Sequence, residues 1–156
     1  MPFKQTMFRL TRDLLIENLA KGTTAEQLSQ RLQSEGATLT EQFGKAADTI
    51  ANRKQIGHII GIERWGQSRI RTLLGSPLRI DEYDSYRPDA AADMAIIRAE
   101  WAHTRAATLE LIDQLSSAGI DFGTTVEHND FGPMSVRGWL TYLNTHATLE
   151  AKRIRP

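Results

Sequence analysis

The chain has 156 residues, with 19 basic and 19 acidic side chains and no cysteine. This length suits one domain with a substantial core, and the charge balance argues against a nucleic-acid binder, which usually carries a basic excess. The absence of cysteine excludes disulfides, an iron–sulfur cluster and a thiolate nucleophile, so a metal must be bound by His, Asp, Glu or backbone groups, and a thiol in the chemistry must come from a small molecule.

Nothing in the sequence indicates a membrane segment or a targeting signal. No apolar run approaches the roughly 18 residues that a membrane-spanning helix needs. The first residues, MPFKQTMFRLTRDLLIENLAKG, alternate charged and apolar side chains at helical spacing, unlike the uninterrupted apolar core of a signal peptide. We therefore expect a cytoplasmic protein with no membrane partner.

The N-terminal region predicts two helices, the second of them short. Residues 3–20 repeat apolar side chains on one helical face, and Gly22 ends this amphipathic helix. Thr23 followed by Glu26 has the form of a capping box, which opens the short helix. Gly36 is expected to break it.

The next predicted helix is the longest. A second capping signal at Thr38 and Glu41 opens it, and apolar residues at spacings of three and four continue to Leu74. Its middle, residues 51–57, is polar and contains Gly57, so a kink or break is expected there.

Two irregular segments flank the helix that follows. Residues 75–90 contain Gly and Pro without apolar periodicity, which predicts a connecting loop long enough for a crossover. An apolar stripe from Met94 to Leu115 predicts a helix of many turns. A second irregular segment, residues 121–134, is expected to be extended briefly at 124–126 before the last helix.

The C-terminal helix begins after Ser135 and carries two polar residues on its core face. Spacings of three and four place five side chains on that face: Trp139, Leu143, His146, Glu150 and Ile154. His146 and Glu150 are four residues apart and therefore lie one above the other. Together, the predicted elements indicate an all-α four-helix bundle with a long crossover loop and a short extra helix near the N-terminus, a fold that places sites on facing helices.

A third ligand candidate lies on the long helix. His58, in GHIIGIERWG, can lean toward the core side of that helix, and with His146 and Glu150 it makes a set of two imidazoles and one carboxylate. Such a set suits Zn²⁺, Fe²⁺ or Ni²⁺ and leaves coordination positions open for water or substrate. The alternative is a surface ion pair between Glu150 and Arg153, which are three residues apart, with His58 a hydrogen-bonded, partly buried side chain.

Three segments resemble the DinB-like superfamily of small four-helix metalloproteins. They are GHIIGIERWGQSRIRTLLG (57–75), SPLRIDEYD (76–84) and TVEHNDFGPMSVRGWLTYLNTHATLEAKRI (125–154), in the order that the family has them. Members typically bind a divalent metal through one His on the second helix and His-x-x-x-His on the last. The resemblance assigns these roles to His58, His146 and Glu150, with Glu in place of the third His.

The resemblance also implies a function. Better-understood members are metal-dependent transferases and isomerases that use low-molecular-weight thiols, and others are described as metal-dependent hydrolases or as damage-inducible proteins of unknown activity. Members are often homodimers. For this chain we therefore expect a divalent metal (Zn, Ni or Fe), a small-molecule substrate and a homodimer, with a low-molecular-weight thiol as a candidate cosubstrate.

Two functional hypotheses follow. In the first, the protein is a metal-dependent hydrolase or thiol transferase whose pocket is shaped by residues 76–90 and 121–134. The weaker candidates for acid–base or substrate contacts are Glu63, Tyr83, His128 and Arg153. In the second, the protein is a non-catalytic dimeric bundle with a degenerate metal site. A third hypothesis, direct DNA binding, is disfavoured by the charge balance.

Overall fold

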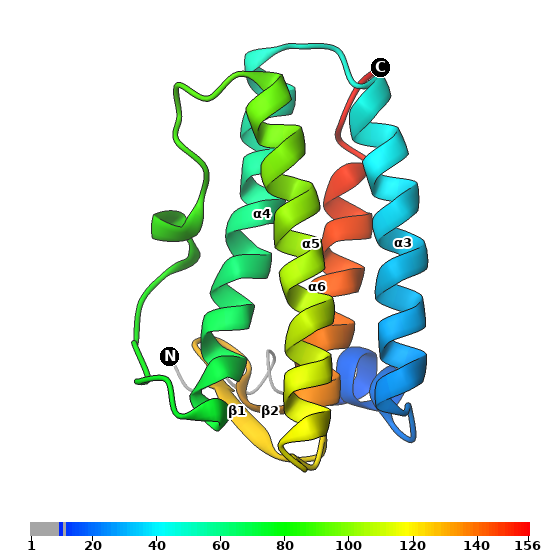
Figure 1. Cartoon of the computed structure of the whole chain (residues 1–156), viewed down its shortest axis with the longest axis vertical. Helices are drawn as coiled ribbons and strands as arrows, with labels where there is room; N and C mark the ends of the chain where they lie inside the picture. Colours follow the sequence, from blue (N-terminus) through cyan, green and yellow to red (C-terminus); the bar gives the residue numbers. More distant parts are fainter. Residues whose placement is uncertain (1–9, 11) are drawn as a thin grey trace.

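The computed structural model describes residue 10 and residues 12–156, and four long helices dominate it (Figure 1). They are α3 (Ala25–Lys45), α4 (Ile50–Ile70), α5 (Met94–Ser117) and α6 (Val136–Ala151). Within the described residues, the strands are β1 (Thr125–His128) and β2 (Gly132–Ser135), which pair as a short antiparallel hairpin. The predicted all-α four-helix bundle is therefore confirmed, and the predicted extended piece is the first strand of this hairpin.

The order of the helices explains the long crossover. Helices α3 and α4 each pack against both α5 and α6, so consecutive helices α3 and α4 lie diagonally opposite. Figure 1 shows α4 and α5 running in the same direction. Their connection must therefore travel back along the bundle, and it does so along α4, with a short 3-10 turn, η3 (Tyr83–Tyr86), packed against that helix.

The prediction that Gly36 breaks a helix is wrong. Helix α3 continues from Ala25 to Lys45 through this residue. A Cβ atom at Gly36 would lie only 2.8 Å from Cγ of Arg105, which is buried between the helices. The glycine makes room for that side chain, at the modest cost of about 1 kcal/mol that a glycine imposes inside a helix. Its role is in packing.

The predicted break at residues 51–57 is also wrong, because α4 is continuous through Gly57. The chain instead turns at residues 46–49, where Thr49 caps α4 by accepting a hydrogen bond from the Asn52 N–H. The Asn52 side chain, 3% exposed, donates to the carbonyls of Ala47 and Arg155 and accepts from the Arg155 N–H. This one amide joins the turn to the C-terminal tail.

Helix α3 is capped one residue later than predicted. Thr24, rather than Thr23, accepts from the backbone N–H of Gln27, and the Gln27 side chain accepts from the Thr24 N–H. The capping box is thus completed by a glutamine instead of Glu26.

The N-terminal segment differs from the amphipathic helix predicted for residues 3–20. Residues 1–9 and 11 lie outside the described residues; the rest forms a π-helical turn, η1 (Arg12–Glu17), and a short helix, α2 (Asn18–Ala20). Arg12 donates to the carbonyls of Phe131 and Pro133, and Glu17 accepts from the N–H and hydroxyl of Ser135. Polar anchors therefore join this segment to the hairpin, while its leucines are exposed: Leu10, Leu14, Leu15 and Leu19.

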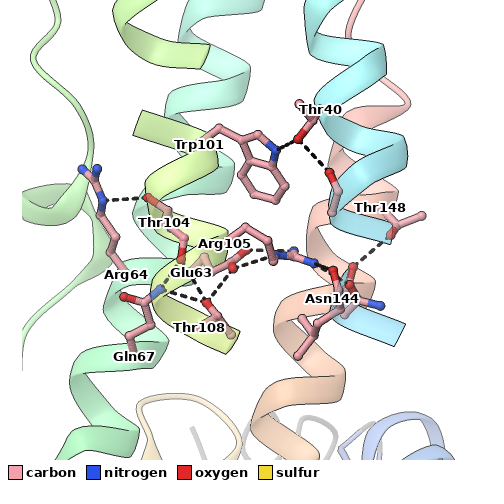
Figure 2. Close-up of polar contacts among 12 residues, drawn as sticks. Thr40, Glu63, Arg64, Gln67, Trp101, Thr104, Arg105, Thr108, Asn144 and Thr148 are labelled. Atoms are coloured by element: carbon pink, nitrogen blue, oxygen red, sulfur yellow. Dashed lines mark hydrogen bonds and ion pairs between the residues drawn. The ribbon is translucent and has the colours of Figure 1, made fainter. Parts of the chain in front are cut away.

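Two apolar clusters fill the bundle, and a polar layer lies between them. One cluster, around Trp65 and Trp139, lies at the hairpin end. The other, around Phe43 and Trp101, lies toward the other end. In the layer between them, shown in Figure 2, Arg105 forms two hydrogen bonds of 2.9 Å with the Glu63 carboxylate.

The C-terminal helix begins as predicted, with Ser135 as its N-cap, and ends at Ala151. Ile154, which was placed on the core face of the same helix, follows the helix end but is still buried. Across the described residues, no helix is both long enough and apolar enough to cross a membrane.

Candidate metal centre

The structure brings His58, His146 and Glu150 together. Helices α4 and α6 pack side by side, and His58 on α4 faces the last two turns of α6. One potential ligand atom from each of the three side chains lies within 4.8 Å of the other two, and the two imidazole centroids are 5.1 Å apart. All three side chains are partly buried. They form the cluster that is called the metal centre below.

Glu150 is held in place by two donors. Its Oε2 accepts from Nε2 of Gln55 at 2.7 Å and from Nη1 of Arg153 at 2.9 Å. Gln55 also donates to the Glu150 backbone carbonyl. Among the described residues, no donor contacts Oε1 of Glu150, so this carboxylate keeps an oxygen free for another partner.

The surroundings of the metal centre favour the neutral form of both imidazoles. Burial, with a smaller contribution from His58, lowers the pKa of His146 to about 4. Burial also lowers the pKa of His58, with a contribution from Arg87, although the Glu150 carboxylate opposes this shift. A neutral imidazole has a lone pair on one nitrogen, which is the form that binds a metal.

The donor set fits a divalent cation. Atoms that bind a tetrahedral ion at about 2.0–2.2 Å lie about 3.4 Å from one another. The three ligand atoms lie within 4.8 Å of one another without an ion between them, which is close to that spacing. Two neutral imidazoles and one carboxylate are ligands suited to zinc, iron or nickel. His58, His146 and Glu150 can therefore hold such an ion.

Aromatic rings form the walls of the metal centre. Tyr83, from η3, lies edge-on to His58 with ring centroids 5.1 Å apart, and Tyr142, one turn before His146 on α6, lies 5.9 Å from that imidazole. Burial raises the pKa of Tyr142 to about 12, so its phenol stays protonated. Arg87 stacks over the Tyr83 ring and its Nη2 lies 3.4 Å from Nδ1 of His58.

The weaker sequence candidates divide into two groups. Tyr83 and Arg153 lie at the metal centre, in contact with His58 and Glu150 respectively. Glu63 does not, because its carboxylate is engaged by Arg105 in the middle of the bundle (Figure 2). The fourth histidine of the chain, His103, is exposed on α5.

His128 lies at the end of β1 and has a structural environment of its own. It is 4% exposed, and its Nδ1 accepts from the backbone N–H groups of Asp130 and Phe131, which closes the hairpin turn. Its ring contacts Trp65 and Trp139. Burial and the charge of Arg69 lower the pKa of His128 to about 4. It is separated from the metal centre by Tyr142, which contacts both His128 and His146.

Three residues of the site were missed from the sequence. Gln55 lies three residues before His58, and Tyr142 lies four residues before His146, so helical spacing alone could have placed both on the ligand face. Arg87 is different. It reaches His58 from the crossover, where no periodicity indicates which side chains meet α4.

A sequence model of a protein family matches most of the chain. The sequence model of the DinB superfamily matches residues 7–149. The chain belongs to the DinB superfamily. The resemblance stated from the motifs is thereby confirmed. Searches of curated proteins and of solved structures give no match. The family match includes His58 and His146 and ends one residue before Glu150, so the assignment of Glu150 depends on the geometry described above.

Proposed function

We propose that this DinB-superfamily protein is a metal-dependent enzyme in which His58, His146 and Glu150 hold a divalent metal. The observation that supports this most directly is the convergence of their ligand atoms, within 4.8 Å, from two helices that pack against each other. Three protein ligands leave coordination positions open, which is typical of catalytic rather than structural sites.

The residues around the metal centre have separate tasks. When bound, a divalent cation supplies Lewis acidity that lowers the pKa of a water or a thiol. Gln55 orients the Glu150 carboxylate by the hydrogen bond to Oε2. Tyr83 and Tyr142 restrict the access of water to the imidazoles. The phenol of Tyr142, protonated at neutral pH, provides a hydrogen-bond donor beside the site.

The reaction class that fits is hydrolysis or transfer to a low-molecular-weight thiol, acting on a small molecule. The chain has no cysteine, so a thiol nucleophile would be a cosubstrate. Cobalt-substituted protein separates the two classes. A thiolate-to-cobalt charge-transfer band on addition of free cysteine, absent on addition of serine, supports the transferase; hydrolysis of an ester or amide without such a band supports the hydrolase.

A second candidate function is a non-catalytic dimeric bundle with a degenerate metal site. The observation that favours it is the contact of Glu150 with Arg153 and Gln55, which accounts for the carboxylate without a metal. In this case the protein would act through dimerisation or a partner, and its oligomeric state would not depend on added metal.

Metal content decides between the two candidates. Protein purified without an affinity tag should contain one divalent metal per chain, and His58→Ala, His146→Ala and Glu150→Ala should each lose it. His103→Ala is the matched control, because this histidine is exposed on α5. Wild-type protein that takes up no Zn²⁺, Ni²⁺, Mn²⁺ or Fe²⁺ on incubation would exclude the metalloenzyme. Retention of metal by Glu150→Ala alone would assign this carboxylate to the ion pair with Arg153.

A further inference from the structure

A cavity of about 340 Å³ lies beside the metal centre, between α4, the end of the crossover and α5. Its apolar wall includes Ile50 at the exposed edge, Pro88, and Ile97, which is buried. Gly57 forms part of the wall on α4, where a Cβ atom would come 3.6 Å from Cδ of Pro88. The cavity therefore has the size of a small-metabolite site and has room that a larger residue at Gly57 would fill.

The polar side chains of this cavity are mostly cationic. They are Arg53, Lys54 and Arg87, against one carboxylate, that of Asp89. Arg53 is paired with Asp48, and Asp89 accepts from the backbone N–H two residues further on. Lys54 forms no hydrogen bond or ion pair with any residue that the structure describes. The cavity thus combines apolar walls with a cation that has no anionic partner.

Arg87 connects the cavity to the metal centre. It lines the cavity, forms an ion pair of 3.0 Å with Asp84, and directs Nη2 at Nδ1 of His58, 3.4 Å away. A guanidinium only donates hydrogen bonds, so this contact requires a lone pair on Nδ1.

That contact is incompatible with a metal on His58. If the metal binds Nδ1, Arg87 loses its acceptor; if it binds Nε2, Nδ1 carries a proton and faces the Arg87 donor. A metal ion on His58 and the Arg87 guanidinium beside this imidazole would also repel each other, because both carry positive charge. Arg87 must therefore turn away from His58 when a metal binds, and its side chain already borders the cavity.

We propose that the cavity binds a small organic anion with an apolar body, held by Lys54 and Arg87, and that this anion draws Arg87 away from His58. Anion binding and metal binding then favour each other. The anion binds whether or not a metal is present; its assignment as the substrate class of the enzyme rests on the proposed function.

Phenylacetate is a suitable probe, with phenylacetamide as its neutral counterpart and inorganic phosphate as an anion without an apolar body. On metal-free protein, phenylacetate should shift the methyl NMR signals of Ile50 and Ile97. Both other probes should bind at least about tenfold more weakly. Phenylacetamide loses the charge-assisted contact with the cations, and inorganic phosphate loses the apolar contacts. Lys54→Met should weaken phenylacetate binding about tenfold and leave Zn²⁺ affinity, measured without phenylacetate, unchanged.

Two more variants test the remaining parts of the proposal. Gly57→Leu, a helix-favouring change that fills the cavity, should abolish the methyl shifts. Saturation with Zn²⁺ should tighten phenylacetate binding at least about fivefold in the wild type, and Arg87→Gln should remove this coupling. Equal binding of phenylacetate and phenylacetamide, an unaffected Lys54→Met variant, or coupling that persists in Arg87→Gln would each overturn the proposal. Absence of Zn²⁺ binding would contradict the proposed metalloenzyme and the coupling between metal and anion. It would leave the anion site itself standing, because the probe is first measured on metal-free protein.

Discussion

The two polar sites inside the bundle differ in how completely their groups are paired. In the central layer, Arg105 binds both oxygens of Glu63 and also donates to the Leu32 carbonyl and to Asn144, while Thr108 donates to Glu63 (Figure 2). In the metal centre, the imidazoles of His58 and His146 contact aromatic rings, and Oε1 of Glu150 accepts no hydrogen bond among the described residues.

This difference indicates different roles. The central layer joins all four long helices and satisfies its charges internally, so we infer that it fixes how the helices pack. The metal centre involves two helices, lies closer to solvent and keeps acceptors unused, as a site for an external ligand requires. A carboxylate on the apolar side of a helix is therefore not enough to indicate a ligand-binding site. The number of hydrogen-bond acceptors in its surroundings that have no donor within the protein distinguishes such a site better from a structural polar layer.

The largest expected effect comes from breaking the central layer. Arg105→Met should lower the free energy of unfolding by about 3–5 kcal/mol, because the Glu63 carboxylate stays buried without its counter-ion. Urea denaturation measures this loss. Metal content per folded chain should not change, since neither residue contacts the metal centre.

The double variant Glu63→Leu, Arg105→Met is the control for this prediction. It removes more polar contacts but leaves no unpaired charge, so it should be more stable than Arg105→Met alone. If the double variant were the less stable of the two, the unpaired Glu63 carboxylate would not be the cause of the loss of stability in Arg105→Met, and the reason given for this prediction would be wrong.

The next effect is a pH dependence of stability that His128 produces. Its folded pKa of about 4 is below the ordinary value of 6.5, so the unfolded chain takes up a proton that the folded chain does not. The free energy of unfolding should therefore fall by about 2 kcal/mol between pH 7 and pH 5 on account of this residue.

His128→Asn tests this prediction, because an asparagine oxygen can accept the same backbone N–H groups and does not titrate. The variant should lose this part of the pH dependence, whereas His103→Asn, at an exposed site, should keep it. The remaining slope should include contributions from His146, whose pKa is also lowered to about 4, and from His58, whose pKa is lowered by burial. An unchanged slope in His128→Asn would contradict the assignment.

A smaller effect is expected from the residue that orients Glu150. Gln55→Leu should weaken Zn²⁺ binding about 10–100-fold, the range typical for an outer-shell partner of a metal ligand. Competition with a chelator of known affinity measures it. Gln33→Leu, on an exposed position of α3, is the matched control. Loss of stability in Gln55→Leu without loss of Zn²⁺ affinity would favour the non-catalytic bundle.

Much of the site could be predicted from the sequence because it depends on spacing along helices. The four-residue spacing of His146 and Glu150 placed them on one face, and the family motif added His58. The helix boundaries in the first half of the chain were harder to predict from the sequence. Gly36 has the appearance of a helix breaker, and its true partner, Arg105, is far away in the sequence and was not identified as buried. Arg87 was missed for a related reason, since an irregular crossover does not reveal which side chains meet α4.

The smallest effect concerns Arg153, the residue that left two interpretations of Glu150 open. Its side chain is 69% exposed, against 6% for Arg105, although both donate to a carboxylate at 2.9 Å. Arg153→Gln should therefore change the free energy of unfolding by less than about 1 kcal/mol. It should also increase Zn²⁺ affinity a few-fold, because a competing cation is removed from Glu150, and this gain should shrink as salt screens the charge. A Zn²⁺ titration at two salt concentrations measures the gain in affinity and its dependence on salt.

If the free energy of unfolding of Arg153→Gln fell and its Zn²⁺ affinity did not rise, the main partner of Glu150 would be Arg153. The two ion pairs would then be similar in their role as well as in their geometry.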